Sequence, residues 1–80
     1  MSINVKALWD KDADVWVATS DDVPGLVAEA ETSEELIQKL RILIPELLEL
    51  NGLITNFDHN DDIPFHLLSE RTETIRVSRI

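Results

Sequence analysis

The sequence predicts a small α+β domain of the order β-β-β-α-β, with one helix on one face of an antiparallel sheet. Polar and apolar residues alternate over residues 3–10, and a period of two is typical of a half-buried strand. Leucine and isoleucine recur every three or four residues over 33–50, which indicates one apolar face of a helix. Because such a helix can cover only one side of the sheet, we expect the other side to stay open.

Two further short strands are predicted before the helix. Residues 15–20 are rich in β-branched and aromatic side chains, and their closeness to the first strand predicts an antiparallel hairpin. A turn over residues 21–25 follows, because Pro24 presets its backbone angle and Gly25 tolerates a positive φ. Residues 26–30 then form the third predicted strand.

The predicted helix has clear start and stop signals. Thr32, followed three residues later by Glu35, fits a capping box, in which each side chain binds the backbone amide of the other residue. Asn51 and Gly52 supply the stop signal. Pro45 removes a backbone donor inside the helix, so we expect one helix that is kinked at this point.

A fourth strand and a chemically different segment are predicted after the helix. Residues 63–68 form the strand, with Pro64 at its start or edge. Residues 72–80 alternate again and indicate either a fifth strand or an arm that exchanges between subunits. We therefore divide the chain into an α+β domain over residues 1–69 and a C-terminal strand or arm over residues 70–80.

The chain has a formal net charge of −9, and this charge is unevenly distributed. Residues 1–69 contain four basic and fourteen acidic residues, whereas residues 70–80 contain three basic and two acidic residues. This balance argues against direct nucleic-acid binding, because Lys and Arg are needed to neutralise phosphates. Two interpretations stay open: an acidic surface that keeps the protein soluble, or one that attracts a basic partner protein.

Composition also bears on location and assembly. The 80 residues include no cysteine, which favours a reducing, cytoplasmic compartment and excludes a disulfide or a thiolate metal site. We expect no signal peptide, because the first residues lack a basic leader and an apolar run. The most apolar stretch, residues 36–50, is interrupted by charged residues, so no membrane span is expected. A small core with an open sheet face favours a homodimer.

We expect no catalysis, no bound metal and no cofactor. A nuclease of the ribonuclease H type needs a metal-binding carboxylate in its first strand, where this chain has Asn4, Lys6 and Leu8. His59 and His66 lack the spacing of a zinc site. The two glycines of the chain cannot form a glycine-rich phosphate loop.

Two other features have both a functional and a structural interpretation. Asp58, Asn60 and Asp62 have the spacing of the first ligands of a calcium-binding loop, but no glycine follows, and a solvated acidic loop is the favoured interpretation. Trp9 and Trp16 are interpreted as packing residues of the sheet or core. The alternative is that they are anchors of a protein interface.

Two neighbouring motifs are similar to those of a known protein family. Residues 16–26 (WVATSDDVPGL) and residues 29–36 (EAETSEEL) resemble the HicB antitoxin family in their order and spacing. The resemblance covers about residues 3–68. It is closest to a short branch that lacks a C-terminal DNA-binding domain and is marked by Trp9-Asp10 and by residues 44–48. It implies a partial ribonuclease H fold with no catalytic centre.

The resemblance also implies a function. Members of the family bind a small basic, mRNA-cleaving HicA-type toxin directly and neutralise it, and the acidic charge of this chain suits such a partner. We predict a partner-binding site at four acidic residues: Asp21, Asp22, Glu29 and Glu31. The alternative function is a stand-alone regulatory or small-ligand-binding module without a toxin partner.

Overall fold

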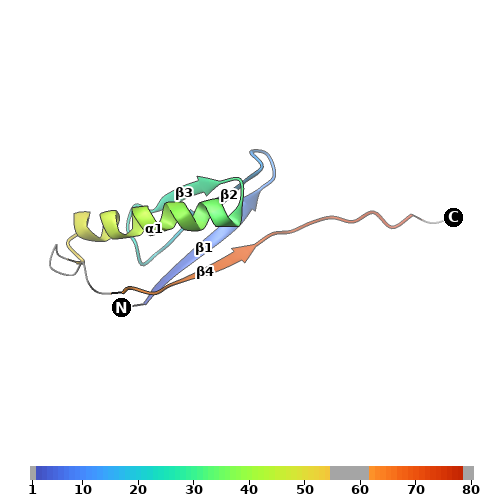
Figure 1. The fold of residues 1–80 in the computed structure, drawn as a ribbon. Helices are drawn as coiled ribbons and strands as arrows, with labels where there is room; N and C mark the ends of the chain where they lie inside the picture. Colours follow the sequence, from blue (N-terminus) through green and yellow to red (C-terminus); the bar gives the residue numbers. More distant parts are fainter. Residues whose placement is uncertain (1, 55–61, 79–80) are drawn as a thin grey trace.

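The computed structural model describes residues 2–54 and 62–78 and shows one sheet with one helix beside it (Figure 1). The four strands form a single sheet of the order β3-β2-β1-β4. In chain order the elements are β1 (Ile3–Asp10), β2 (Val15–Thr19), β3 (Val27–Ala30), α1 (Ser33–Leu50) and β4 (Phe65–Glu70). The α+β class and the order of elements predicted from the sequence are confirmed.

The sheet is mixed, so the expectation of a purely antiparallel sheet is wrong. β1 and β2 form the predicted antiparallel hairpin, and β3 pairs antiparallel with β2. β4, however, pairs parallel with β1. β3 runs in the same direction as β1, and α1 then carries the chain back along the sheet. The next strand therefore starts at the same end as β1 and runs parallel to it, as in a crossover connection.

The turn between β2 and β3 forms as the sequence predicts. The amide of Leu26 donates to the carbonyl of Val23 at 3.1 Å, and Gly25 has a φ of 83°. This is the pattern of a type II turn, with Pro24 in its second position. The side-chain amide of Asn51 donates to the carbonyl of Pro24 at 3.2 Å, which ties the turn to the end of α1.

α1 begins at its predicted cap and continues through Pro45. The hydroxyl oxygen of Thr32 accepts a hydrogen bond from the amide of Glu35 at 3.1 Å. Within the described chain, the Glu35 carboxylate makes no return bond to the Thr32 amide, so only half of the capping box forms. The single helix over residues 33–50 is confirmed at both ends.

The end of α1 is closed by a Schellman motif. Gly52 has a φ of 72°, and its amide donates to the carbonyl of Glu49 at 3.0 Å. The amide of Leu53 donates to the carbonyl of Leu48 at 2.8 Å. A glycine at this position avoids the steric cost of a left-handed conformation, which explains why Asn51-Gly52 is an effective stop signal.

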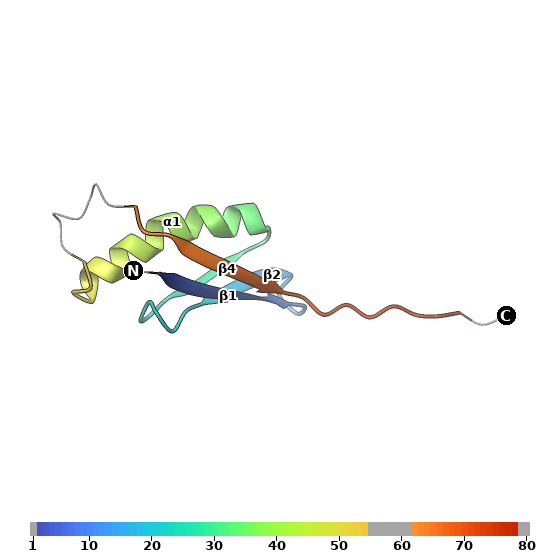
Figure 2. The ribbon, with the colours of Figure 1, turned by 90° about the horizontal axis from the view of Figure 1, so that it is seen from below.

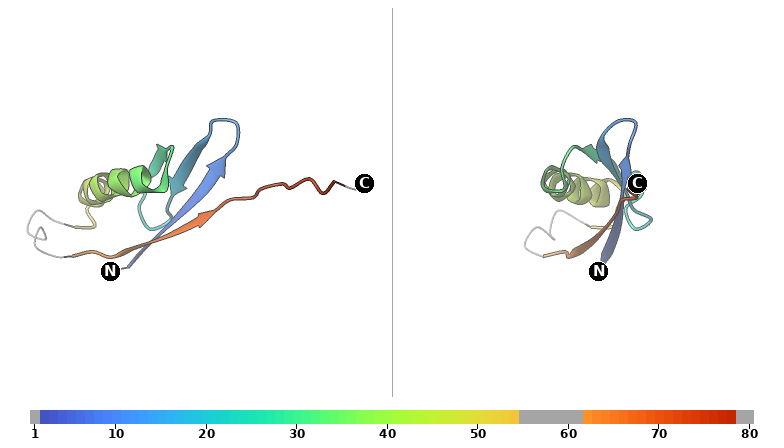
Figure 3. Two further views of the ribbon diagram at one scale, coloured as in Figure 1. Left: turned by 45° about the vertical axis from the view of Figure 1, so that its right-hand side comes forward. Right: turned by 90° about the vertical axis from the view of Figure 1, so that its right-hand side faces the viewer.

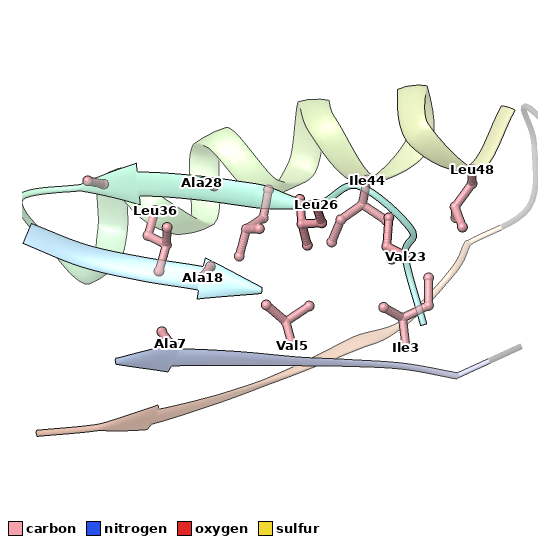
Figure 4. Packing of buried hydrophobic residues seen from close by; sticks show 12 residues of the cluster. Ile3, Val5, Ala7, Ala18, Val23, Leu26, Ala28, Leu36, Ile44 and Leu48 are labelled. Carbon is pink, nitrogen blue, oxygen red and sulfur yellow. The ribbon is translucent and has the colours of Figure 1, made fainter. Parts of the chain in front are cut away.

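The core lies between α1 and one face of the sheet (Figure 4). Alternate residues of β1 point toward the helix, as Figure 4 shows for Ile3, Val5 and Ala7, and each is at most 2% exposed. From the helix, side chains spaced by four residues complete the core: Leu36, Leu40, Ile44 and Leu48. α1 lies on this side of the sheet, and no other helix of the described residues covers the opposite face.

Residues 71–78, which we call the arm, leave the end of β4 as an extended segment (Figure 2). The left-hand view of Figure 3 shows that the arm extends from the end of β4 beyond the sheet and the helix. All eight of its residues are exposed, and within the described chain they belong to no strand. The described residues also include no helix that is long and apolar enough to cross a membrane.

Candidate functional site

The face of the sheet opposite α1, which we call the open face, exposes large apolar side chains. Leu8 is 49% exposed, Leu68 50% and Val27 63%. The strand register and the alternation of side chains place residues of all four strands on this face: Asn4, Lys6, Leu8, Asp10, Val15, Val17, Thr19, Val27, Glu29, His66, Leu68 and Glu70. The open side predicted from the single apolar face of the helix is therefore present.

Two rows of neighbouring side chains cross the open face. In one row Leu8 lies between Val17 of β2 and Glu70 of β4, and Glu29 of β3 lies beyond Val17. Leu8 and Val17 make the middle of this row apolar, while a carboxylate stands at each end. This row thus has an apolar middle and acidic ends.

In the second row Lys6 lies between Thr19 of β2 and Leu68 of β4. The ammonium nitrogen of Lys6 is 3.6 Å from a carboxylate oxygen of Glu70. Both side chains of this ion pair are about half exposed, so solvent screens their attraction. The pair still places the positive charge of Lys6 within the open face.

A hollow of about 520 Å³ lies at the end of the open face where β1 begins and β2 ends. Both positively ionisable side chains that line it, Lys6 and His66, come from the sheet, and Asp21 and Asp22 come from the loop after β2. Its complete lining consists of Asn4, Val5, Lys6, Thr19, Ser20, Asp21, Asp22, His66 and Leu68. The hollow therefore combines basic and acidic side chains with hydroxyl groups and apolar surface.

Three hydrogen bonds fix the loop that borders the hollow. The backbone amide of Asn4 donates to a carboxylate oxygen of Asp22 at 2.8 Å. The hydroxyl of Ser20 donates to the carbonyl of Asn4 at 2.6 Å and accepts from the amide of Asp22 at 3.1 Å. Asp22 thus holds the loop against the start of β1, and both Asp22 and Asp21 beside it are exposed.

The structure brings only two of the four predicted acidic residues together. Asp21 and Asp22 line the hollow, whereas Glu29 lies on β3 and Glu31 follows it. Thr19, which lines the hollow, pairs with Val27 of β3. Glu31 comes four residues after Val27, which is about 13 Å farther along the sheet at a rise of about 3.3 Å per residue. The four residues border the open face and do not form one cluster.

Sequence reasoning missed Lys6 and His66 as members of the site. Lys6 could have been found, because it shares the polar side of the first strand with Asn4. His66 could not, because its position beside Asn4 depends on the parallel pairing of β4 with β1. An antiparallel sheet would have placed a different residue of the fourth strand at the hollow.

The two tryptophans form a second cluster, on the helix side of the sheet. Trp9 and Trp16 are cross-strand neighbours, with ring centroids 5.3 Å apart and planes at 68°. Trp16 packs against the core, which confirms the packing interpretation for this residue. The guanidinium carbon of Arg71 lies 4.0 Å from the centroid of the Trp9 ring, a cation–π contact.

Metal-binding side chains do not converge in the described part of the chain. There, no group of three or more His, Cys, Asp or Glu side chains could hold a metal ion. Asp58 and Asn60 of the possible calcium-binding loop lie outside the described residues, so its interpretation as a solvated acidic loop stays a prediction.

Comparison with known proteins places the chain in a family. The model of a family described as a domain of unknown function, DUF1902, matches residues 2–79. The crystal structure of the hypothetical protein TTHA1013 from the extremely thermophilic bacterium Thermus thermophilus is similar to this chain, with 47% identity and a TM-score of 0.68. The match covers 96% of this chain and 100% of that one. No curated protein matches the chain. The chain belongs to the DUF1902 family.

Proposed function

We propose that the chain is a non-catalytic, antitoxin-like domain that binds a small basic protein through its open face. The observation that carries this proposal is the exposure of large apolar side chains on the open face, at Leu8, Val27 and Leu68, together with carboxylates at its edges. Protein interfaces have an apolar core surrounded by a polar rim, and exposed apolar patches mark such surfaces.

The charge of the chain supports a basic partner. Fourteen acidic residues against four basic ones over residues 1–69 create a negative potential around the domain. Such a potential repels nucleic acids and other acidic proteins and accelerates encounters with a positively charged protein. Asp21 is exposed at one end of the open face and Glu29 at one side, so the border can contact the partner directly.

The resemblance to HicB antitoxins supports the identity of the partner as a HicA-type toxin. The motifs over residues 16–26 and 29–36 form β2, the following turn, β3 and the start of α1, and β2 and β3 contribute to the open face. Such a toxin is a small basic enzyme that cleaves mRNA. On this proposal the chain inhibits it by covering its active site.

A tagged copy of the chain, recovered from its native cells and analysed by mass spectrometry, tests the proposal. We expect a small basic protein in near-equal amount, and we expect the purified chain to inhibit RNA cleavage by that protein. A preparation that contains only the chain itself would contradict the proposal. So would a captured protein whose activity the chain leaves unchanged.

Charge reversal tests the acidic border. The double variant Asp21→Lys and Glu29→Lys removes two carboxylates from the border, and we expect it to weaken binding of the recovered partner by at least about tenfold. The matched control is Asp12→Lys with Glu46→Lys, which makes the same change of net charge on exposed residues of the β1–β2 hairpin loop and of α1. Equal loss in both variants would show a general charge effect and not a site.

The hollow favours a second candidate function, a small-ligand-binding module without a toxin partner. Lys6, His66 and the two aspartates offer charged groups, and Ser20 and Thr19 offer hydroxyls, around one concave surface. NMR titration of the chain with small metabolites would test it. Saturable shifts confined to the amides of Ser20, Asp21 and His66 would favour this function, and the absence of such shifts would leave the protein-binding proposal.

A further inference from the structure

We infer that the arm of one chain pairs as a strand with β4 of a second copy, so that two chains exchange their arms in a homodimer. The strands run antiparallel about a twofold axis that passes through Thr72. Each arm becomes the fifth strand of its partner's sheet, in the order β3-β2-β1-β4-arm. This inference goes beyond the proposed function and requires no toxin.

The composition of the arm is that of a strand that lacks a partner. Ile75 is 83% exposed and Val77 is 77% exposed, and both are β-branched. They alternate with Thr74, Arg76 and Ser78, which gives the outer part of the arm, residues 74–78, one apolar and one polar side. Within the described chain, no backbone hydrogen bond joins the arm to another segment. By pairing with the edge of a sheet, an extended segment of this kind gains backbone hydrogen-bond partners.

The contact between Arg71 and Trp9 fixes which way the arm faces. β1 and β4 are in parallel register with Leu8 opposite Glu70, so Arg71 is the next residue opposite Trp9. Its guanidinium lies over the Trp9 ring on the helix side of the sheet. If the alternation continues, Glu73, Ile75 and Val77 face the same side as the core residues Val5 and Ala7. The arm therefore leaves the domain already aligned with its sheet.

β4 provides a matching edge. The strand order places β4 at the border of the sheet, with β1 as its neighbour in the described chain, so its other backbone edge is unpaired. On the helix side, Phe65 and Leu67 are only partly buried, because α1 packs over β2 and β3. The apolar side of an added arm, with Ile75 and Val77, would lie next to these half-covered side chains. Unpaired edges of this kind are templates for another strand.

Charge excludes three registers and favours one. A twofold axis perpendicular to the sheet keeps both helices on one side and places one residue opposite its own copy. With Glu70, Arg71 or Glu73 on the axis, two like charges would stand directly opposite each other, which is destabilising. Thr72 on the axis avoids this conflict. It also places Arg71 opposite Glu73 of the partner subunit.

The same register places an apolar residue of the arm opposite an apolar residue of the partner's β4. With Thr72 on the axis, Val77 is opposite Leu67 of the partner subunit, and Ile75 is opposite the partner's Ser69. Every residue from 66 to 78 then has an antiparallel neighbour, which satisfies both the unpaired edge of β4 and the backbone of the arm. The resulting ladder is about twice as long as β4 alone.

Cysteine crosslinking tests the register in a chain that has no cysteine of its own. Thr72→Cys places two thiols directly opposite each other, so mild oxidation should give a disulfide-linked dimer in high yield. Thr74→Cys is the matched control. Its two copies are four residues apart along the ladder, about 13 Å, which is too far for a disulfide. Efficient crosslinking of neither variant, or equal crosslinking of both, would overturn the register.

Light scattering of the purified chain tests the dimer itself. We expect twice the chain mass of 9.1 kDa at micromolar concentration, and monomers for the double variant Ile75→Glu and Val77→Glu. These residues touch no core side chain, so circular dichroism should show an unchanged fold. Ile42→Glu, at an exposed position of α1, is the control that stays dimeric. A monomeric wild-type chain would overturn the inference. A dimer insensitive to the arm substitutions would do so too, and would point to association through the open face.

Discussion

The two faces of the sheet are built from the same strands and differ in what covers them. On the helix side, Ile3, Val5 and Ala7 of β1 are at most 2% exposed. On the open face, the intervening Leu8 of β1 is 49% exposed and Val27 of β3 is 63% exposed. Neighbouring residues of one strand therefore lie in surroundings as different as a core and a surface.

This difference separates stability from binding. Burial of apolar area against α1 stabilises the domain by about 25 cal/mol per Å². The open face contributes little to folding while it is exposed to water, so its apolar residues are available to a partner. We expect substitutions on the helix side to change the free energy of unfolding, and substitutions on the open face to change binding.

The largest contrast is expected between two adjacent residues of β3. Ala28→Glu places a carboxylate against the core, and we expect a loss of at least about 4 kcal/mol, enough to unfold a domain of this size. Val27→Glu points to the open face and should change the free energy of unfolding by less than about 1 kcal/mol. Urea unfolding followed by circular dichroism measures both. Similar losses of unfolding free energy in the two variants would show that the two faces do not differ in their contribution to stability.

Truncation of a leucine on each side gives a smaller contrast. Leu40 of α1 is fully buried, and Leu40→Ala should cost about 3 kcal/mol through lost burial and a new cavity. Leu8→Ala, at a half-exposed position, should cost less than about 1 kcal/mol. The same unfolding experiment applies. On the proposed function, Leu8→Ala should instead weaken binding of the basic partner, and an unchanged affinity would count against the open face as the site.

The cap of α1 offers a third test, because the two faces of the sheet differ in whether this helix covers them. Thr32→Ala removes the acceptor of the Glu35 amide, and we expect a loss of about 1 kcal/mol. Thr32→Ser keeps a hydroxyl and serves as the control with nearly the stability of the wild type. Thermal unfolding would show the difference as a lower midpoint for the alanine variant only. Equal midpoints in all three proteins would show that the cap contributes little.

The smallest effect is expected for the ion pair of the open face. Glu70→Gln removes the partner of Lys6, and both side chains are about half exposed. We expect a change of less than about 0.5 kcal/mol in the free energy of unfolding, and this change should vanish at high salt. Urea unfolding at low and high salt measures it. A loss above about 1 kcal/mol would indicate that the open face contributes to folding.

Most of the local structure could be predicted because its signals lie close together in the sequence. The alternation over residues 3–10, the cap at Thr32, the turn at Pro24-Gly25 and the stop at Asn51-Gly52 each depend on neighbouring residues. The physical rules behind these signals act over a few residues, so a single sequence was enough to predict the elements. The apolar stripe of α1 likewise indicated that one sheet face would remain open.

The arrangement of the site required more than these local rules. The direction of β4 depends on how α1 carries the chain across the sheet, and the sequence does not encode that direction in any short pattern. The prediction of an antiparallel sheet failed for this reason, and His66 was not assigned to the hollow. The four acidic residues were identified as candidates, but their separation along the edge of the sheet became visible only in three dimensions.

One sequence was sufficient to predict the order of the elements, the helix cap, the acidic charge and an uncovered sheet face. Three other features became visible only in the folded domain: β4 lies parallel beside β1, a hollow is lined by both Asp21 and His66, and Arg71 at the start of the arm contacts Trp9. The reason is the distance along the chain over which each interaction acts. Helix and turn signals act between neighbours in the chain. The pairing of β1 with β4 instead joins residues about 60 positions apart, such as Asn4 and His66, and is set by the packing of the whole domain.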